Sequence, residues 1–319
     1  MFYQKINGSW ENITQGNKEV QPRVRNYFIT SNSTEGKVYS LANNGGPQVA
    51  WQNDFSGHQV SIDVEASKDE MYGVNSSGQI SKFNTRGFQP GSINLQGTTS
   101  GSDPQKLIYN KPNDNVYVAT STTLERFGGS YQWFSTSISG VNDLAVFDNG
   151  NAVVAEDSSG PIRKFDTNGN ELWSYNTSEN KTAIATTGNG NVIYGNANGE
   201  LKKLTTDGSS VATTYTGSFN SGVPVKLMSN PNGELYVAWD EAGNYNFGGF
   251  NLDLTFNFSL DISEVPKNIS YYDSSVYVST SSTIWNFSTA NSSPTLGFVF
   301  DNTYSDGSVL GVYKAFVYV

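Results

Sequence analysis

Two pairs of adjacent carboxylates are the residues of this sequence best suited by type to chemistry. Glu156-Asp157 and Asp240-Glu241 each follow a short apolar run that predicts a β-strand, so both pairs are expected in equivalent loops at one end of their sheets. Such oxygen atoms bind calcium, and two carboxyl groups about 5 to 9 Å apart hydrolyse glycosidic bonds. Trp239 precedes the second pair, and an exposed indole ring stacks on sugars. The simpler interpretation, which we favour, is two acidic turns beside a packed tryptophan.

The only histidine, His58, follows Asp54 by four residues in a loop that also contains Ser and Gly. One imidazole cannot form a zinc site with two histidine ligands, and Ser-His-Asp chemistry would have to run through this residue alone. We favour a solvated loop histidine. The sequence has no cysteine and no phosphate loop, EF-hand or nucleophile elbow. It therefore predicts no catalytic residue, no metal site and no cofactor, and leaves the residues above as candidate ligand contacts.

The charge balance excludes one large class of partner. Lys and Arg number 19 against 29 Asp and Glu, which gives a net charge of −10. Phosphate backbones require basic patches, so we expect no nucleic-acid binding. The N-terminal residues lack a basic segment followed by an apolar run, and the sequence has no run of about eighteen apolar residues. We therefore expect neither an export signal nor membrane insertion.

A β-hairpin predicted within 161–178 is the structural element that recurs along the chain and positions the candidate residues. Two short apolar strands, Ile162 to Phe165 and Leu172 to Tyr175, flank Asp166-Thr167-Asn168-Gly169-Asn170, whose Asn-Gly step suits a tight turn. The first strand recurs along the chain as an apolar residue followed by another three residues later. The first positions are Tyr3, Val38, Ile80, Leu124, Ile162, Leu201, Phe247 and Ile284, and the second are Ile6, Leu41, Phe83, Phe127, Phe165, Leu204, Phe250 and Phe287.

This recurrence predicts an all-β fold, because successive members of the second series lie 35 to 46 residues apart, the spacing of propeller blades. We predict a single domain over 1–319, an eight-bladed β-propeller of four-stranded antiparallel blades. Residues 1–15 and 305–319 would form a composite blade that closes the ring, with seven further blades in 16–304. Deletion of Phe316 to Val319 would then lower thermal stability. Bulky rings of the outer strands are expected to wedge between blades: Trp10, Trp51, Trp133 and Trp173.

Lys164-Phe165-Asp166-Thr167-Asn168-Gly169-Asn170-Glu171-Leu172-Trp173 resembles the repeat of the PQQ-like (quinoprotein alcohol dehydrogenase-like) propellers. Asp166, Gly169 and Trp173 match the family's turn and its docking tryptophan. The resemblance covers most of the chain as architecture, but only this unit fits the motif closely, and it implies eight blades. Catalytic members use an adjacent cysteine pair and calcium ligands near the quinone. Because this chain has no cysteine, the resemblance implies the scaffold of non-catalytic relatives, which present loops to other proteins.

The segment Gln4 to Ile13 resembles a phrase of the form KVNGxW found in tail and surface proteins of phages and archaeal viruses. With the acidic, polar composition, it leads us to expect a non-enzymatic virion or cell-surface protein that presents loops for host-receptor binding or virion assembly. The expected partners are a host surface glycan or protein and other virion proteins, at the virion surface or outside the cell. Two alternatives stay open: an extracellular or periplasmic PQQ-like scaffold of a cellular organism, and a carbohydrate-active hydrolase or lyase using the acidic loops.

Overall fold

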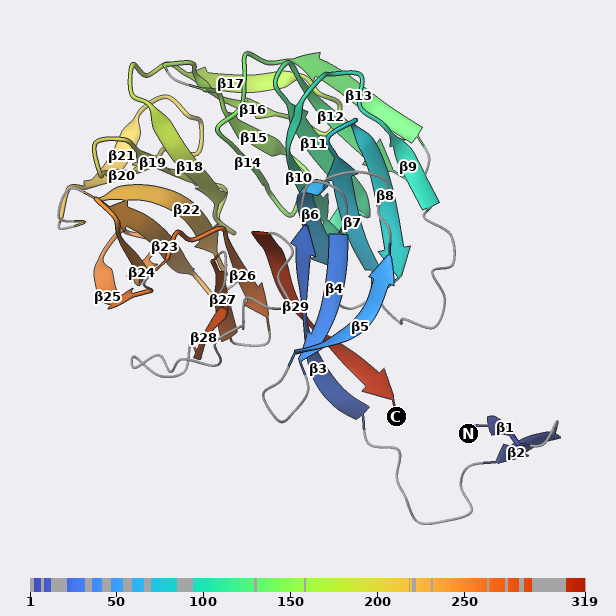
Figure 1. The fold of residues 1–319 in the computed structure, drawn as a ribbon. Coiled ribbons are helices and arrows are strands. Elements are labelled where there is room, and N and C mark those ends of the chain that lie inside the picture. Colours follow the sequence, from blue (N-terminus) through green and yellow to red (C-terminus); the bar gives the residue numbers. More distant parts are fainter. Residues whose placement is uncertain are drawn as a thin grey trace.

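The fold is described from a computed structural model of the chain, drawn in Figure 1. The structure describes residues 3–6, 9–12, 22–31, 36–41, 47–53, 59–65, 70–84, 94–128, 131–157, 159–217, 219, 222–230, 232–262, 264–272, 275–280, 284–288 and 308–318. In this part of the chain the one helical element is the short 3-10 turn η1 (Lys111–Asn113). No helix there is long and apolar enough to cross a membrane.

The described strands form six four-stranded sheets, one three-stranded sheet and a two-stranded hairpin, all antiparallel. The hairpin and the first three sheets consist of β1 (Tyr3–Ile6) and β2 (Ser9–Asn12); β29 (Ser308–Tyr318), β3 (Pro22–Ser31), β4 (Gly36–Leu41) and β5 (Pro47–Asn53); β6 (Gln59–Glu65), β7 (Glu70–Asn75), β8 (Gln79–Asn84) and β9 (Asn94–Thr98); and β10 (Pro104–Asn110), β11 (Asn115–Thr120), β12 (Thr123–Gly128) and β13 (Tyr131–Ser137).

The remaining sheets follow in sequence order. They consist of β14 (Asp143–Val146), β15 (Ala152–Ala155), β16 (Ile162–Phe165) and β17 (Glu171–Tyr175); β18 (Lys181–Thr186), β19 (Val192–Asn196), β20 (Leu201–Leu204) and β21 (Val211–Tyr215); β22 (Val223–Ser229), β23 (Glu234–Glu241), β24 (Asn244–Asn251) and β25 (Phe256–Asp261); and β26 (Asn268–Tyr272), β27 (Ser275–Ser279) and β28 (Ile284–Ser288). The prediction of an all-β fold built from four-stranded antiparallel sheets is confirmed.

The first strand of each larger sheet contacts the first strand of the next. In order these innermost strands are β6, β10, β14, β18, β22 and β26, and β29 contacts both β26 and β6. Figure 1 shows the sheets fanned around the region where these strands meet. The predicted number of eight blades is not confirmed, because the described residues form seven sheets of three or four strands.

The predicted composite blade of 1–15 and 305–319 is not what the structure shows. The last segment is one long strand, β29, which pairs with β3 from Ser308 opposite Ser31 to Tyr318 opposite Pro22. Strands β1 and β2 pair with each other, and Figure 1 shows this hairpin apart from the sheets. The composite blade requires two short strands, Val309 to Tyr313 and Phe316 to Val319, with a turn between them at Lys314-Ala315. Neither residue favours a turn, so the extended segment continues.

Side chains of the innermost strands join neighbouring sheets. Ser61 Oγ on β6 accepts a hydrogen bond from the Leu107 amide on β10 at 3.0 Å. Likewise, Asp143 Oδ2 on β14 accepts one from the Ile184 amide on β18 at 3.0 Å. An innermost strand has no further strand to pair with on its axial side. Such side chains therefore satisfy backbone groups that the sheets leave open.

The hydrophobic core lies between sheets, so the second strands are buried on both faces. Strands β11, β15 and β19 are buried along their whole length. One cluster joins Phe147, Val153 and Ile162 of the sheet β14–β17 to Ile184 and Tyr194 of the sheet β18–β21. Sheet-on-sheet burial of this kind fixes each sheet relative to the next.

Glycine turns between third and fourth strands receive aromatic rings from the preceding sheet. Gly169 (φ 84°) and Gly208 (φ 68°) both have left-handed backbone, which glycine adopts readily. A Cβ atom on Gly208 would lie 2.3 Å from the Trp173 ring, and one on Gly169 would lie 2.7 Å from the Phe134 ring. Each ring therefore packs directly on the turn of the next sheet.

The predicted wedge between sheets is confirmed for Trp173 and wrong for Trp133. In the sheet β10–β13 the ring that packs on the next turn is Phe134, and Trp133 is 63% exposed. Adjacent residues of a strand point to opposite faces, so a shift of one residue exchanges a wedge for a surface ring. The side chains of the other two tryptophans in the prediction, Trp10 and Trp51, lie outside the described residues.

Replacement of Gly208 by alanine tests this packing. We expect Gly208→Ala to lower the free energy of unfolding by about 2 kcal/mol or more, since it adds left-handed strain of about 1 to 2 kcal/mol and displaces the Trp173 ring. The matched control is Gly190→Ala, where φ is 89° and the nearest atom to a Cβ lies at an ordinary 3.8 Å. Urea unfolding measures both. Equal losses in the two variants would show that the tryptophan contact contributes nothing.

Candidate functional site

Only the first acidic pair lies in a loop directly after a second strand, as the sequence predicts, while the second pair lies within the end of its strand. Glu156 and Asp157 follow β15, while Asp240 and Glu241 are the last residues of β23. The sheet β18–β21 lies between their two sheets. In the described part of the chain, no group of three or more Asp, Glu, His or Cys side chains is placed to hold a metal ion. The other two candidates, Asp54 and His58, lie outside the described residues.

Glu156 is a buried carboxylate held by a guanidinium group. It is 2% exposed, and its Oε1 lies 2.9 Å from Arg163 Nη1. Arg163 also binds Glu171 Oε2 at 2.7 Å and donates to the carbonyl oxygen of Ser137 at 2.9 Å. Burial alone would lower the pKa of Arg163, but the hydrogen bonds that it donates to Glu156 and Glu171 raise it. Arg163 therefore stays charged and ties the loop after β15 to β17 and to the preceding sheet.

The other candidates make contacts typical of turns and core. Asp157 is exposed and its carbonyl accepts from the Gly160 amide at 2.9 Å. Asp240 Oδ1 accepts from the Gly243 amide at 3.0 Å, and Glu241 Oε2 accepts from an asparagine amide on β24 at 3.0 Å. Trp239 is 3% exposed and its ring centroid lies 4.9 Å from that of a buried phenylalanine. These contacts match the simpler interpretation, two acidic turns beside a packed tryptophan.

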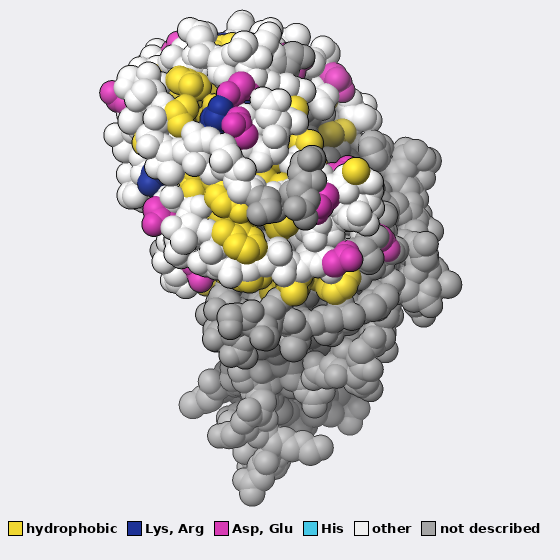
Figure 2. All heavy atoms as spheres, turned by 90° about the vertical axis from the view of Figure 1, so that its left-hand side faces the viewer, with side chains coloured by type: hydrophobic (Ala, Val, Ile, Leu, Met, Phe, Trp, Pro, Cys, Tyr) yellow, Lys and Arg dark blue, Asp and Glu magenta, His cyan; other side chains and the backbone are white. Residues whose placement is uncertain are grey.

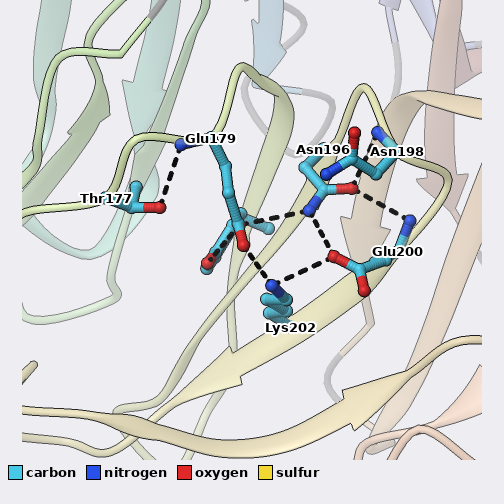
Figure 3. Close-up of polar contacts among 7 residues, drawn as sticks. Thr177, Glu179, Asn196, Asn198, Glu200 and Lys202 are labelled. Atoms are coloured by element: carbon cyan, nitrogen blue, oxygen red, sulfur yellow. Dashed lines mark hydrogen bonds and ion pairs between the residues drawn. The ribbon is translucent and has the colours of Figure 1, made fainter.

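A second polar network, which the sequence analysis missed, lies in the sheet β18–β21 (Figure 3). Lys202 Nζ contacts Glu179 Oε1 and lies 3.0 Å from Glu200 Oε2. Glu179 Oε2 accepts from Tyr194 Oη at 3.0 Å and from Asn196 Nδ2 at 3.1 Å. Burial would raise the pKa of Glu179, yet these hydrogen bonds hold it below the usual value. A carboxylate kept charged in this way suits a structural contact better than a general acid.

Lys181 lies between the loop that contains Glu156 and the polar network around Glu179. It is fully buried at the start of β18, and its Nζ donates to the carbonyl oxygen of Gly160 in the loop after β15. Burial lowers the pKa of Lys181, an effect that the nearby charges of Glu156 and Glu179 oppose. The sequence signal was available in part, because a lysine that begins a buried strand needs acceptors. The acceptor itself, a loop carbonyl from the previous sheet, is visible only in the fold.

Trp133 is the most exposed of the large apolar side chains in the described residues. Its ring on β13 is 63% exposed, and the Arg126 guanidinium carbon on β12 lies 5.0 Å from the ring centroid. Arg126 also donates to the carbonyl oxygen of Thr167 in the next sheet. Other exposed apolar side chains are Leu172 (50%), Phe256 (44%) and Val265 (40%). Figure 2 shows one face of the molecule, on which hydrophobic side chains gather in several groups among backbone atoms and other side chains.

Solved structures with a similar fold include β-propeller proteins. Saccharomyces cerevisiae Sqt1 is 12% identical with a TM-score of 0.67, over 89% of this chain and 83% of that one. The WD40 propeller domain of Doa1 is 13% identical with a TM-score of 0.64, over 80% and 86%. The computationally designed Ika8 protein is 15% identical with a TM-score of 0.57, over 79% and 80%.

Sequence comparison gives no relative. No protein-family model matches the chain, and no curated protein matches it. Neither the PQQ-like family nor a resemblance to viral surface proteins is shown by the comparisons. At such low identities the structural likeness shows the fold alone. The chain has a β-propeller fold similar to that of WD40 proteins.

Proposed function

We propose that this protein is a non-enzymatic binding protein whose propeller presents surface side chains to a glycan. The observation that carries the proposal is the exposed ring of Trp133. It stands on a strand of a four-stranded sheet, and the Arg126 guanidinium lies against it. A flat indole face in contact with water offers a stacking surface for a sugar ring, and its strand and cation restrict its motion.

The acidic candidates support binding more than catalysis. Glycoside hydrolysis needs a carboxyl group that donates a proton and a second that reaches the sugar. Glu156 is buried and bound to Arg163, and Asp240 binds the backbone of its own turn. The hydrolase or lyase remains the alternative, and turnover of a polysaccharide is the observation that would establish it.

We place the protein at the surface of a virion or a cell, where the glycan would belong to a host. The net charge of −10 supports this placement, together with the short resemblance that the sequence of Gln4 to Ile13 suggests, which the comparisons do not show. An extracellular or periplasmic scaffold of a cellular organism is the alternative. Neighbouring capsid or tail genes would be expected only for a virion protein, so gene neighbourhood distinguishes the two.

Substitution of Trp133 tests the proposed binding surface. On a glycan array we expect the wild-type protein to bind at least one glycan, and Trp133→Ala to lose affinity about tenfold or more, which corresponds to about 1.4 kcal/mol. Because Trp133 is exposed, the melting temperature is expected to stay close to that of the wild type. Leu172→Ala, which removes an exposed apolar side chain from β17, is the matched control and is expected to bind normally.

Two results would contradict the proposal. Wild-type protein that binds no glycan, or Trp133→Ala protein that binds as well as wild type, would show that this ring is not a sugar platform. Turnover of a polysaccharide panel that is abolished by Glu156→Gln or Asp240→Asn would establish the hydrolase or lyase instead.

A further inference from the structure

The innermost strands carry seven residues at one common level around the axis. The level is defined by the first apolar position of the sequence repeat, which lies on the third strand of each sheet. This position pairs with a residue of the second strand, and that residue pairs in turn with the innermost-strand residue at the common level. In the sheet β10–β13, for example, Lys106 pairs with Ala119, which pairs with Leu124. The residues at this level are Ser61, Lys106, Asp143, Ala183, Lys226, Asn268 and Gly311.

Lys106 and Asp143 occupy this level on adjacent sheets and form an ion pair. Lys106 Nζ lies 2.9 Å from Asp143 Oδ1. The other oxygen of Asp143 accepts from the Ile184 amide, so both oxygens of this carboxylate have partners. A nearby second carboxylate, Asp63 on β6, accepts from the Tyr109 amide at 2.8 Å. The carboxylates at the axis are therefore already bound to groups of the fold.

Lys226 lies at the same level on β22, three sheets along the ring from Lys106 on β10. In a ring of seven innermost strands this position faces Lys106 across the axis. No carboxylate in the described residues lies within ion-pairing distance of Lys226. Lys106 keeps 28% of its side-chain surface in contact with water, although it stands on an innermost strand. Lys226 is also only partly buried.

The electrostatics of this group favour an added negative charge. Repulsion from Lys106, followed by burial, lowers the pKa of Lys226 to about 8, with a smaller contribution from Lys267 and partial compensation by Asp143. Lys267 stands just before β26, the next innermost strand. Among the described residues at the axis there are three lysines and two carboxylates, Asp143 and Asp63, which leaves one excess positive charge in a protein whose net charge is −10. An anion between the lysines would relieve their mutual repulsion.

We propose that the axis of the propeller binds a small oxyanion, with inorganic phosphate as the model ligand, between Lys226 and Lys106. Lys226 supplies an ammonium group without a carboxylate partner in the described residues, and Lys106 supplies the second charge while it keeps its bond to Asp143. Compact ammonium groups bind phosphate oxygens as point charges. The site is independent of Trp133 and of the proposed glycan surface.

Isothermal titration and thermal unfolding with inorganic phosphate test the proposal. Ionic strength is held constant with sodium chloride, so that general screening does not change. We expect saturable binding at pH 7 and a melting temperature about 2 °C higher at a phosphate concentration ten times the Kd. Binding is expected to weaken between pH 7 and pH 9, because Lys226 loses its proton with a pKa of about 8.

Two variants separate a specific site from general attraction. Lys226→Met is expected to abolish the phosphate-dependent rise in melting temperature while the protein stays folded, because the change removes a repelled charge. Lys111→Met removes an exposed lysine from η1, away from the common level, and is expected to keep the full effect. The proposal is overturned if wild-type protein does not respond to phosphate, or if Lys226→Met responds as the wild type does.

Discussion

Deletion of 308–319, which contains β29, is expected to abolish cooperative folding or to lower the melting temperature by more than about 10 °C. Strand β29 pairs with β3 along its whole length and contacts the innermost strands β26 and β6. Its loss would remove about ten backbone hydrogen bonds, each worth about 0.5 to 1.5 kcal/mol net. The sum is comparable with the whole stability of a typical domain, about 5 to 15 kcal/mol. Circular dichroism during heating measures the change.

Deletion of 1–12, which contains β1 and β2, is the matched control and distinguishes two ways of closing the ring. In the structure these strands pair with each other and with no other described strand. We therefore expect a melting temperature close to that of the full chain. A loss as large as that from deletion of β29 would instead support the predicted composite blade of 1–15 and 305–319.

The local part of the fold was predictable because its signals are local. The strands read from the sequence as Ile162 to Phe165 and Leu201 to Leu204 coincide with β16 and β20. Alternating apolar residues and Asn-Gly turns act over a few positions, so they mark strands and hairpins without knowledge of the rest of the chain. The repeat then gave the class of fold, since sheets of this length bury their faces only against one another.

The partnership of distant strands was not predictable in the same way. The residues of an extended segment such as β29 do not indicate which strand it will pair with. The sequence-based prediction therefore paired it with β1 and β2, whereas in the structure it pairs with β3. Trp133 shows the same problem on a smaller scale. Pairing between β12 and β13 shifts between Arg126 and Phe127, as it does at the matching place between β16 and β17, so spacing along the sequence alone does not show which of two adjacent rings faces the next sheet.

For the candidate site, residue type did not show which side chains are free to bind a ligand and which are already bound within the fold. Glu156 was singled out as a carboxylate in a loop, but its partner Arg163 is also visible in the sequence as a cation across the same hairpin. The sequence does not indicate that Lys226 and Lys106 act together, because 120 residues separate them. Only the register of the sheets brings them to one level. Charge at the axis is a property of the ring rather than of any local pattern.

Replacement of Arg163 by methionine is expected to lower the free energy of unfolding by about 3 to 5 kcal/mol, because it leaves Glu156 buried without its cation. The double variant Arg163→Met with Glu156→Gln is expected to recover a large part of this loss, since it removes the unpaired charge as well. Urea unfolding of the wild type, both single variants and the double variant measures the coupling energy.

The pH dependence of the Arg163→Met variant shows whether the unpaired carboxylate causes the loss. A buried carboxyl group without a cation has a folded-state pKa above its unfolded value, so the folded state binds the proton more tightly. The cost is then largest where the carboxyl group is ionised and shrinks as the pH falls, in contrast to the Arg163→Met, Glu156→Gln double variant, which has no such group. A loss that is independent of pH and not rescued by Glu156→Gln would mean that Arg163 acts through Glu171 and Ser137.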